Sequence, residues 1–149
     1  MKKGDQAATF CPCPCGGGVF ADCCAPFLSG ALVASTAEAL MRSRYSAYTL
    51  CDEAYLLATW HRSTRPLAGL FDDDAGLTWL GLTIKSTLRL RKRKEARNDA
   101  EVCDAGAGSD TVEFVARYKI GGRAHRLHEV SRFVREQGRW FYLDGRFSE

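Results

Sequence analysis

Four cysteines near the N-terminus have the spacing of a metal site. Cys13 and Cys15 form one close pair, Cys23 and Cys24 form another, and a run of glycines lies between the pairs. Thiolate sulfur is a soft ligand, and four thiolates complete the tetrahedral shell of zinc at a Zn–S distance of about 2.3 Å. Because all four positions would be occupied by protein atoms, the spacing predicts a closed structural Zn²⁺ site with no room for a catalytic water.

Cys11 leaves the ligand set open at this point. Cys11-Pro12-Cys13 repeats the spacing of the first pair, so Cys11 with Cys13 could replace Cys13 with Cys15. A third interpretation leaves the thiols unliganded or makes two of them a redox pair. Five of the seven cysteines lie between positions 11 and 24. In a reducing compartment such clustering favours metal binding or redox chemistry over disulfides.

The rest of the composition is that of an ordinary globular protein. The chain has 149 residues, of which 46% are hydrophobic and 26% charged, and its net charge is +3. This length fits one domain with a short appendage. The first residues lack the apolar run of about 7–15 residues that a secretory signal needs, and no window approaches the ~18 apolar residues of a membrane span. We therefore expect a cytoplasmic protein.

Two helices are expected after the cysteine segment. Residues 11–30 are rich in proline and glycine and show no helical or strand period. Ser35 can cap a first helix, with Glu38 as its capping-box partner. A second helix is expected from Asp52 through Trp60. Small or apolar residues at helical spacing mark the buried face of the first helix: Ala39, Leu40, Ser43, Ala47 and Leu50.

An antiparallel meander is expected in the second half of the chain. Apolar and polar residues alternate there, and Leu80, Leu82 and Ile84 are expected to face the core. Gly121-Gly122 and Gln137-Gly138 are turn signals, and Asp144 is expected in a further turn. Helices followed by a meander predict an α+β fold, a curved sheet with helices on one side. The expected strands cover residues 80–91, 112–119, 124–135 and 139–144.

Three stretches of sequence carry a family resemblance. Cys13-Pro14-Cys15 with Cys23-Cys24 resembles the SEC-C motif, a zinc module also found in the SecA translocation ATPase, although the gap between the pairs is one residue shorter than usual. The stretch from Leu40 to Tyr48 and the ending from Gly138 to Gly145 are similar to the bacterial YchJ family. The resemblance covers nearly the whole chain. It implies a SEC-C-like zinc-binding segment at residues 1–30 and a nuclear-transport-factor-like, cystatin-like roll at 31–149.

The resemblance also implies candidate ligand-binding residues, because rolls of this superfamily often hold a cavity between helix and sheet. Arg44 and Tyr45 on the first helix could reach into it, or the arginine could cap or pair at the rim while the tyrosine packs. Glu129, a carboxylate on an apolar strand face, is either paired or suited to acid–base work. His128 must point to the opposite face. His61 could act as a base, but a histidine at a helix end more often contacts terminal carbonyls.

A basic stripe is the strongest charge feature. Lys85, Arg89, Arg91 and Arg93 share one face of the expected strand and could contact phosphates. No run of exposed aromatic residues accompanies them for base stacking. A solvated edge strand whose charges resist aggregation is the favoured interpretation.

These residues assemble no complete set of nucleophile, base and orienting group. We therefore expect a zinc-binding, non-enzymatic adaptor whose zinc knuckle docks on a protein partner. The alternative is a small-ligand-binding protein, or a hydrolase- or isomerase-type enzyme, that uses the cavity of the roll. A weak nucleic-acid binder acting through the basic strand is the least favoured hypothesis, since the net charge is only +3.

Overall fold

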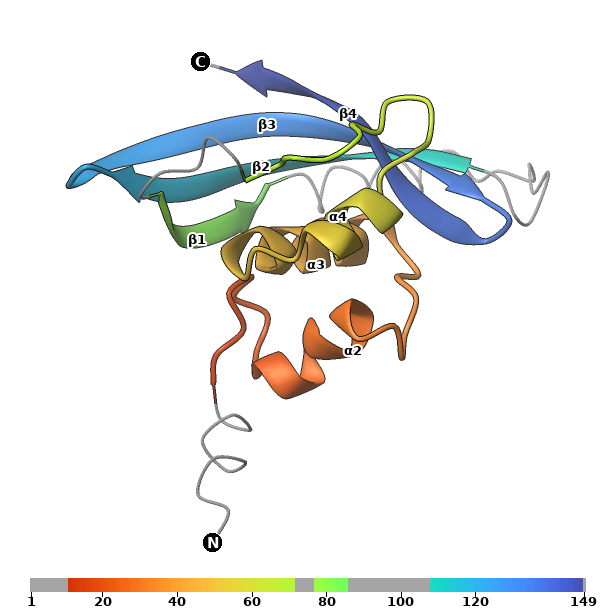
Figure 1. Cartoon of the computed structure of the whole chain (residues 1–149), viewed down its shortest axis with the longest axis horizontal. Coiled ribbons are helices and arrows are strands. Elements are labelled where there is room, and N and C mark those ends of the chain that lie inside the picture. The colour runs from red at the N-terminus through yellow and green to blue at the C-terminus, as the bar shows by residue number, and fades with distance from the viewer. Residues whose placement is uncertain (1–10, 72–76, 86–107, 149) are drawn as a thin grey trace, which may run out of the picture.

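The computed structural model describes residues 11–71, 77–85 and 108–148. A curved antiparallel sheet of four strands forms one layer, and two helices, α3 and α4, lie against one of its faces (Figure 1). The cysteine segment lies on the side of α3 that faces away from the sheet (Figure 1). This is the α+β arrangement that the order of helical and alternating segments predicted.

The central helix α3 spans Ala37–Thr49 and begins one residue later than predicted. Thr36 has an extended backbone, and its hydroxyl accepts a hydrogen bond of 3.0 Å from the backbone N–H of the third helical residue. The prediction of Ser35 as the cap was therefore wrong. Glu38 does not hold the capping-box position of a helix capped by Thr36. Its carboxylate instead pairs with Arg42, one turn further along the helix, at 3.1 Å.

The buried face of α3 follows the predicted stripe until its last turn. Leu40, Ser43 and Ala47 are buried, whereas Leu50 is exposed. Leu50 is the C-cap of the helix, and the chain turns away at Cys51, whose φ is +57°. Helical periodicity predicts burial only for residues within the helix, so it cannot predict the burial of Leu50.

The second helix, α4, spans Glu53–Ala58 and begins one residue after the predicted start, because Asp52 is its N-cap and accepts a hydrogen bond from Tyr55 N at 3.1 Å. The helix ends before Trp60, contrary to the prediction. Trp60 forms a parallel bridge with Tyr142, whose N–H donates to the carbonyl of Thr59 at 2.8 Å. Backbone groups that would have formed the next hydrogen bonds of the helix thus bond to a strand of the sheet instead.

The cysteine segment contains two single turns of helix that its sequence did not predict. A 3₁₀ turn, η1, spans Phe20–Asp22, and a short α-helix, α2, spans Ala25–Leu28 with a proline in its first turn. Proline is tolerated there because that N–H has no partner within the helix. Elements of one turn are too short to show a period in the sequence.

The sheet is a meander in chain order, so each strand pairs with its sequence neighbour. The turns at Gly121-Gly122 and Gln137-Gly138 lie where they were predicted. The last strand is longer than predicted: Asp144 lies inside it and accepts two hydrogen bonds from Arg132 on the neighbouring strand. The strands are β1 (Thr78–Ile84), β2 (Gly108–Ile120), β3 (Arg123–Glu136) and β4 (Arg139–Ser148).

A bulge in β1 changes which side chains face the core. The pairing with β2 shifts between Trp79 and Gly81. As a result Trp79 packs against the core and Leu80 is exposed, so the prediction that Leu80 faces inward was wrong. Leu82 and Ile84 pack against the core as predicted.

The basic stripe lies mostly beyond what the structure describes. Lys85 follows the end of β1 and is exposed. Arg89, Arg91 and Arg93 lie outside the described residues, as does the predicted continuation of the strand to residue 91. The proposed phosphate-binding face therefore stays a prediction.

The main core lies between α3 and the facing side of the sheet. Leu40 and Tyr45 of the helix pack in one cluster with Val112, Phe114 and Phe133 of the sheet. The buried cysteines belong to the same cluster, so the core continues across α3 into the cysteine segment. Among the described residues, no helix is both long and apolar enough to cross a membrane.

Candidate functional site

Four sulfur atoms converge in the cysteine segment. The Sγ atoms of Cys13, Cys15, Cys23 and Cys24, which we call the sulfur cluster, all lie within 4.8 Å of one another. Cys15 Sγ is 3.5 Å from Cys23 Sγ and 3.6 Å from Cys24 Sγ, and the last two are 4.0 Å apart. A tetrahedron of sulfurs around zinc at about 2.3 Å has edges of about 3.8 Å. The spacing of the cluster fits a four-thiolate metal site.

Tight turns bring the two cysteine pairs together. The N–H of Cys13 donates to the carbonyl of Gly18 at 2.7 Å, which closes the loop between the pairs. Gly17 lies directly against the sulfurs: a Cβ at this position would be 3.0 Å from Cys23 Sγ and 3.2 Å from Cys15 Sγ. A larger residue would crowd the cluster, so the glycine run supplies space as well as a turn.

Helix α3 contributes polar side chains that contact the cysteines of the sulfur cluster. Cys13 Sγ lies 3.5 Å from the hydroxyl of Ser46. Arg42 donates from Nη1 to the carbonyl oxygen of Cys15 at 3.1 Å, and the same nitrogen is 4.0 Å from Cys15 Sγ. Hydrogen-bond donors around thiolates orient the ligands and offset their charge. Our sequence reasoning missed Arg42 and Ser46 in this role, although their spacing of four residues places them on one face of α3.

The thiols of Cys15, Cys23 and Cys24 do not ionise alike. Hydrogen bonding from Cys24 lowers the pKa of Cys15 to about 4. Burial and the neighbouring sulfurs raise the pKa of Cys23 to about 12, and the hydrogen bond to Cys15 together with burial raises that of Cys24. A thiolate at Cys15 therefore disfavours ionisation of Cys23 and Cys24, and a positive ion beside them would favour their thiolate forms.

The other two described cysteines lie apart from the sulfur cluster. Cys11 is exposed, and its sulfur is not among those that converge. Cys51 is exposed at the end of α3. Cys103 lies outside the described residues.

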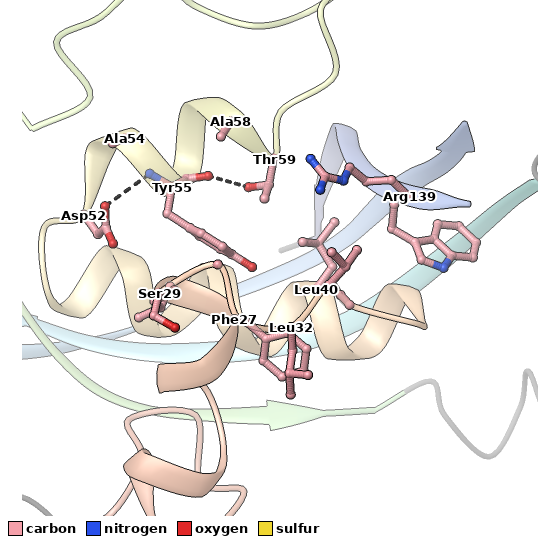
Figure 2. Close-up of a pocket in the computed structure, with 15 residues that line it drawn as sticks. Phe27, Ser29, Leu32, Leu40, Asp52, Ala54, Tyr55, Ala58, Thr59 and Arg139 are labelled. Atoms are coloured by element: carbon pink, nitrogen blue, oxygen red, sulfur yellow. Dashed lines mark hydrogen bonds between the residues drawn. The ribbon is translucent and has the colours of Figure 1, made fainter. Parts of the chain in front are cut away.

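A groove follows the junction between the cysteine segment and the helices, and we call it the junction groove. It has a volume of about 330 Å³. Phe27 and Leu32 line it from α2 and the loop that follows, and Leu40 lines it from α3 (Figure 2). Asp52 and Arg139 lie at opposite ends of the groove (Figure 2). The groove therefore has an apolar wall between an acidic end and a basic end.

A second cavity, which we call the roll cavity, lies between α3 and the sheet. Its volume is about 310 Å³. Arg44, Tyr45 and Glu129, the three candidate ligand-binding residues, all line it. The aromatic side chains of its wall were not predicted as site residues: Tyr48, Trp60, Trp79, Phe114, Tyr142 and Phe147.

Arg44 is buried, with 2% of its surface exposed. Its Nη1 donates to the carbonyl of Leu56 at 2.8 Å and to the hydroxyl of Thr59 at 2.7 Å, so it caps the end of α4. Its Cζ atom lies 4.6 Å from the ring centre of Tyr142 and 5.1 Å from that of Trp60. The guanidinium is held by carbonyl, hydroxyl and aromatic groups.

Glu129 lies across the roll cavity on β3, with 7% of its surface exposed. The hydroxyl of Ser131 donates to its carboxylate. A Cβ at Gly145 on the neighbouring strand would overlap this carboxylate, so the glycine leaves the space that it occupies. Burial raises the pKa of Glu129, and hydrogen bonding from Ser131 and the charge of Arg44 only partly offset that effect.

The histidines that we considered as bases do not line the roll cavity. His61 Nε2 lies 2.6 Å from Glu136, which also pairs with Arg62 at 3.1 Å. His128 points to the other face of the sheet, as predicted, and lies 2.7 Å from Glu113. Both histidines are partners of surface carboxylates, and neither meets Glu129.

Known proteins resemble this chain over nearly its full length. A model of the family described as YchJ, middle NTF2-like domain, matches residues 36–145. A UPF0225 protein of Chromobacterium violaceum is 51% identical over 150 residues, covering 97% of this chain and 98% of its own. A UPF0225 protein of Cupriavidus metallidurans is 50% identical over 154 residues, covering 99% of this chain and 97% of its own.

Two solved structures share the fold. The solution structure of a SEC-C motif containing protein from Rhodopseudomonas palustris superimposes with a TM-score of 0.71 at 32% identity, covering 92% of this chain and 98% of that one. The crystal structure of a SEC-C motif containing protein from Psychrobacter arcticus gives a TM-score of 0.68 at 24% identity, covering 96% and 86%. With the family match and the close relatives, these likenesses show that the chain belongs to the YchJ family of UPF0225 proteins.

Proposed function

We propose that the sulfur cluster binds one zinc ion as a closed structural site. The observation that carries this proposal is the convergence of four sulfurs within 4.8 Å of one another, with those of Cys15, Cys23 and Cys24 only 3.5–4.0 Å apart. The solved SEC-C motif containing protein that is 32% identical to this chain supports the same assignment. Four thiolates complete the zinc shell, so the ion organises the backbone and leaves no position for substrate.

Metal analysis tests this assignment. The purified chain should contain about one zinc ion, and X-ray absorption should show four sulfur neighbours at about 2.3 Å. Cys15→Ser should lose the metal, and Cys11→Ser, the matched control on the same segment, should keep it. Retention of zinc by Cys15→Ser with loss in Cys11→Ser would move the site to the alternative ligand set. A metal-free wild-type chain prepared without chelator would contradict the proposal.

We propose further that the chain is a non-enzymatic adaptor that binds a partner protein through the junction groove. Leu32 is 54% exposed beside this groove, and its neighbour Val33 is exposed as well. Exposed apolar side chains next to a groove are typical of protein-interaction sites. The position of the groove, where the sulfur cluster holds the cysteine segment against α3 and α4, would make partner binding depend on the metal.

The occupant that fits this groove is a short peptide segment of the partner. Its apolar side chains would lie against Phe27, Leu32 and Leu40 (Figure 2). A basic residue on one side would face Asp52 and an acidic residue on the other would face Arg139. Complementary charges at the two ends fix the direction of the peptide more than they add affinity.

The arrangement of titratable groups supports an adaptor over an enzyme. Within the described part of the chain, neither the junction groove nor the roll cavity is lined by a histidine or a cysteine. His61 and His128 are engaged with carboxylates outside both cavities. In the roll cavity the hydroxyl of Ser131 does lie beside the carboxylate of Glu129, but among the described residues no histidine lines either cavity to complete a triad with it.

Selection from a random peptide phage library on the zinc-loaded chain tests the adaptor proposal. Enriched peptides should share an apolar core with a basic residue on one side and an acidic residue on the other. Leu32→Glu should weaken their binding by about tenfold or more. Leu67→Glu is the matched control, because Leu67 is 99% exposed and lies outside the groove. An enriched peptide that binds Leu32→Glu as well as wild type would contradict this placement.

A further inference from the structure

The roll cavity is lined by a buried cation, the guanidinium of Arg44. Arg44 forms no ion pair with a carboxylate of the described residues, although it is 2% exposed. Burying a charge is expensive unless a counter-charge or several hydrogen bonds compensate it. The guanidinium Nη1 donates to the carbonyl of Leu56 and the hydroxyl of Thr59, and Tyr48 also interacts with the guanidinium, so these hydrogen-bond partners are neutral groups. The guanidinium is thus fixed in place with capacity to bind an anion.

The carboxyl group of the roll cavity is held apart from that cation. Glu129 is bound on its own strand by Ser131 and occupies the space over Gly145. Because burial raises the pKa of Glu129, its neutral form is favoured over what it would be in water. A neutral carboxyl leaves the net charge of the cavity positive, and in either form its oxygens can accept a hydrogen bond.

The walls between these two groups suit a flat apolar body. Tyr45 and Trp79 meet edge to face with ring centres 5.6 Å apart, and Trp60 and Tyr142 do so at 5.1 Å. Phe147 lines the cavity while 66% of its surface is exposed, so it lies at the mouth. A volume of about 310 Å³ is at the small end of ligand sites.

We propose that the roll cavity binds a small aromatic carboxylate, with the carboxylate on Arg44, the ring between the aromatic walls, and a hydroxyl or amino substituent donating to Glu129. The arginine supplies charge-assisted hydrogen bonds, which are stronger than those between neutral groups. The opposite polar end selects for a donor on the far side of the ring. This site is independent of the sulfur cluster and of the junction groove, since none of its lining residues belongs to the cysteine segment.

Calorimetric titration with 4-hydroxybenzoate tests the proposal, with 4-hydroxybenzyl alcohol as the neutral probe of similar shape. We expect the carboxylate to bind about tenfold or more tightly than the alcohol, the size of a charge-assisted hydrogen bond in a dry site. Fluorescence of Trp60 and Trp79 should change on binding. Equal affinity for the two probes would overturn the role of Arg44, and no binding of 4-hydroxybenzoate below about millimolar concentration would overturn the site.

Variants at the mouth and in the wall locate the anion. Phe147→Glu and Phe147→Lys introduce opposite charges at an exposed position, so we expect both variants to fold. The Glu variant should bind 4-hydroxybenzoate several-fold more weakly than the Lys variant, and the two variants should bind the alcohol equally because both lack the same ring. Arg44→Met should remove the preference for the carboxylate, and Arg132→Gln, an exposed arginine of β3, is its control. If the two Phe147 variants bind 4-hydroxybenzoate equally, the ligand lies elsewhere and the proposal fails.

Discussion

The sulfur cluster and the roll cavity gather their side chains in opposite ways. The cluster takes its four sulfurs from the stretch between Cys13 and Cys24, where the only helical element is the single turn η1. The roll cavity takes Arg44 from α3 and Glu129 from β3, which are far apart in sequence. Single helical turns are not stable alone, so the first site depends on what binds it. The second depends on a hydrogen-bonded sheet and should survive without any ligand.

The largest effect should come from breaking the sulfur cluster. Cys24→Ser removes one of the four proposed ligands, and we expect zinc content to fall close to zero and amides of residues 11–34 to lose protection in hydrogen exchange. In small zinc domains the apparent metal-binding free energy of about 10–16 kcal/mol is spent on folding. Amides of β2 and β3 should stay protected. Cys51→Ser, an exposed cysteine outside the cluster, is the control.

Deletion of residues 1–30 is the sharper form of the same comparison. We proposed that residues 31–149 are a separate roll, and a chain of this length can bury enough surface to fold alone. Circular dichroism should therefore report a folded, cooperatively melting protein. An unfolded product would mean that the buried cysteines, which pack in the same cluster as Leu40 and Phe133, are an integral part of the core.

A methyl group at Gly145 should damage the roll while leaving the sulfur cluster intact. A Cβ at Gly145 would overlap the carboxylate of Glu129, and overpacking of this kind typically costs about 1–3 kcal/mol. Urea denaturation of Gly145→Ala measures the loss. Gly81→Ala is the matched control, because a Cβ on that strand glycine meets nothing within 4 Å. Adding Glu129→Ala to Gly145→Ala should restore part of the stability; strict additivity would contradict the overlap.

The smallest effect should come from the charge of Glu129. The folded protein holds the proton of this carboxyl more tightly than the unfolded chain, whose pKa is near 4.5, so stability falls as pH rises through the raised folded pKa. Four neighbouring side chains interact with Glu129 by charge or hydrogen bonding: Arg44, Tyr48, Tyr142 and Asp144.

Glu129→Gln removes that titration. We expect the variant to be more stable than wild type at neutral pH and to lose this advantage below the ordinary pKa of glutamate. Chemical denaturation at a series of pH values measures it. A constant difference between the variant and wild type from acidic to neutral pH would contradict the raised pKa.

The two regions also differ in how far the sequence could predict them. The sulfur cluster was predictable because the spacing of Cys13, Cys15, Cys23 and Cys24 is local, and the hairpins were predictable because Gly121-Gly122 and Gln137-Gly138 have turn chemistry of their own. Helix caps were less certain: Ser35 and Thr36 are equivalent by residue type, and only the backbone direction entering α3 chooses between them.

The roll cavity was predictable only in part. Arg44, Tyr45 and Glu129 were candidates, and the cavity brings them together. Trp79 was not a candidate, because the bulge beside Gly81 depends on pairing with β2. Gly145 was not recognised either: its contact with Glu129 requires the pairing of β3 with β4, which shifts between Arg132 and Phe133. Alternation within one strand carries no information about either irregularity.

The two-glycine turn between β2 and β3 sets the register of the hairpin. It thereby decides which side chains of β3 line the roll cavity, although the turn itself does not contact that cavity. That turn places His128 opposite Val115 and Glu129 opposite Phe114. Insertion of a single residue there would slide β3 by one position and turn every side chain to the other face. The imidazole of His128 would then enter the roll in place of the carboxyl group, and Phe133 would leave the core for solvent. Change of one loop length would thus exchange an acid for a base, with no substitution at the site.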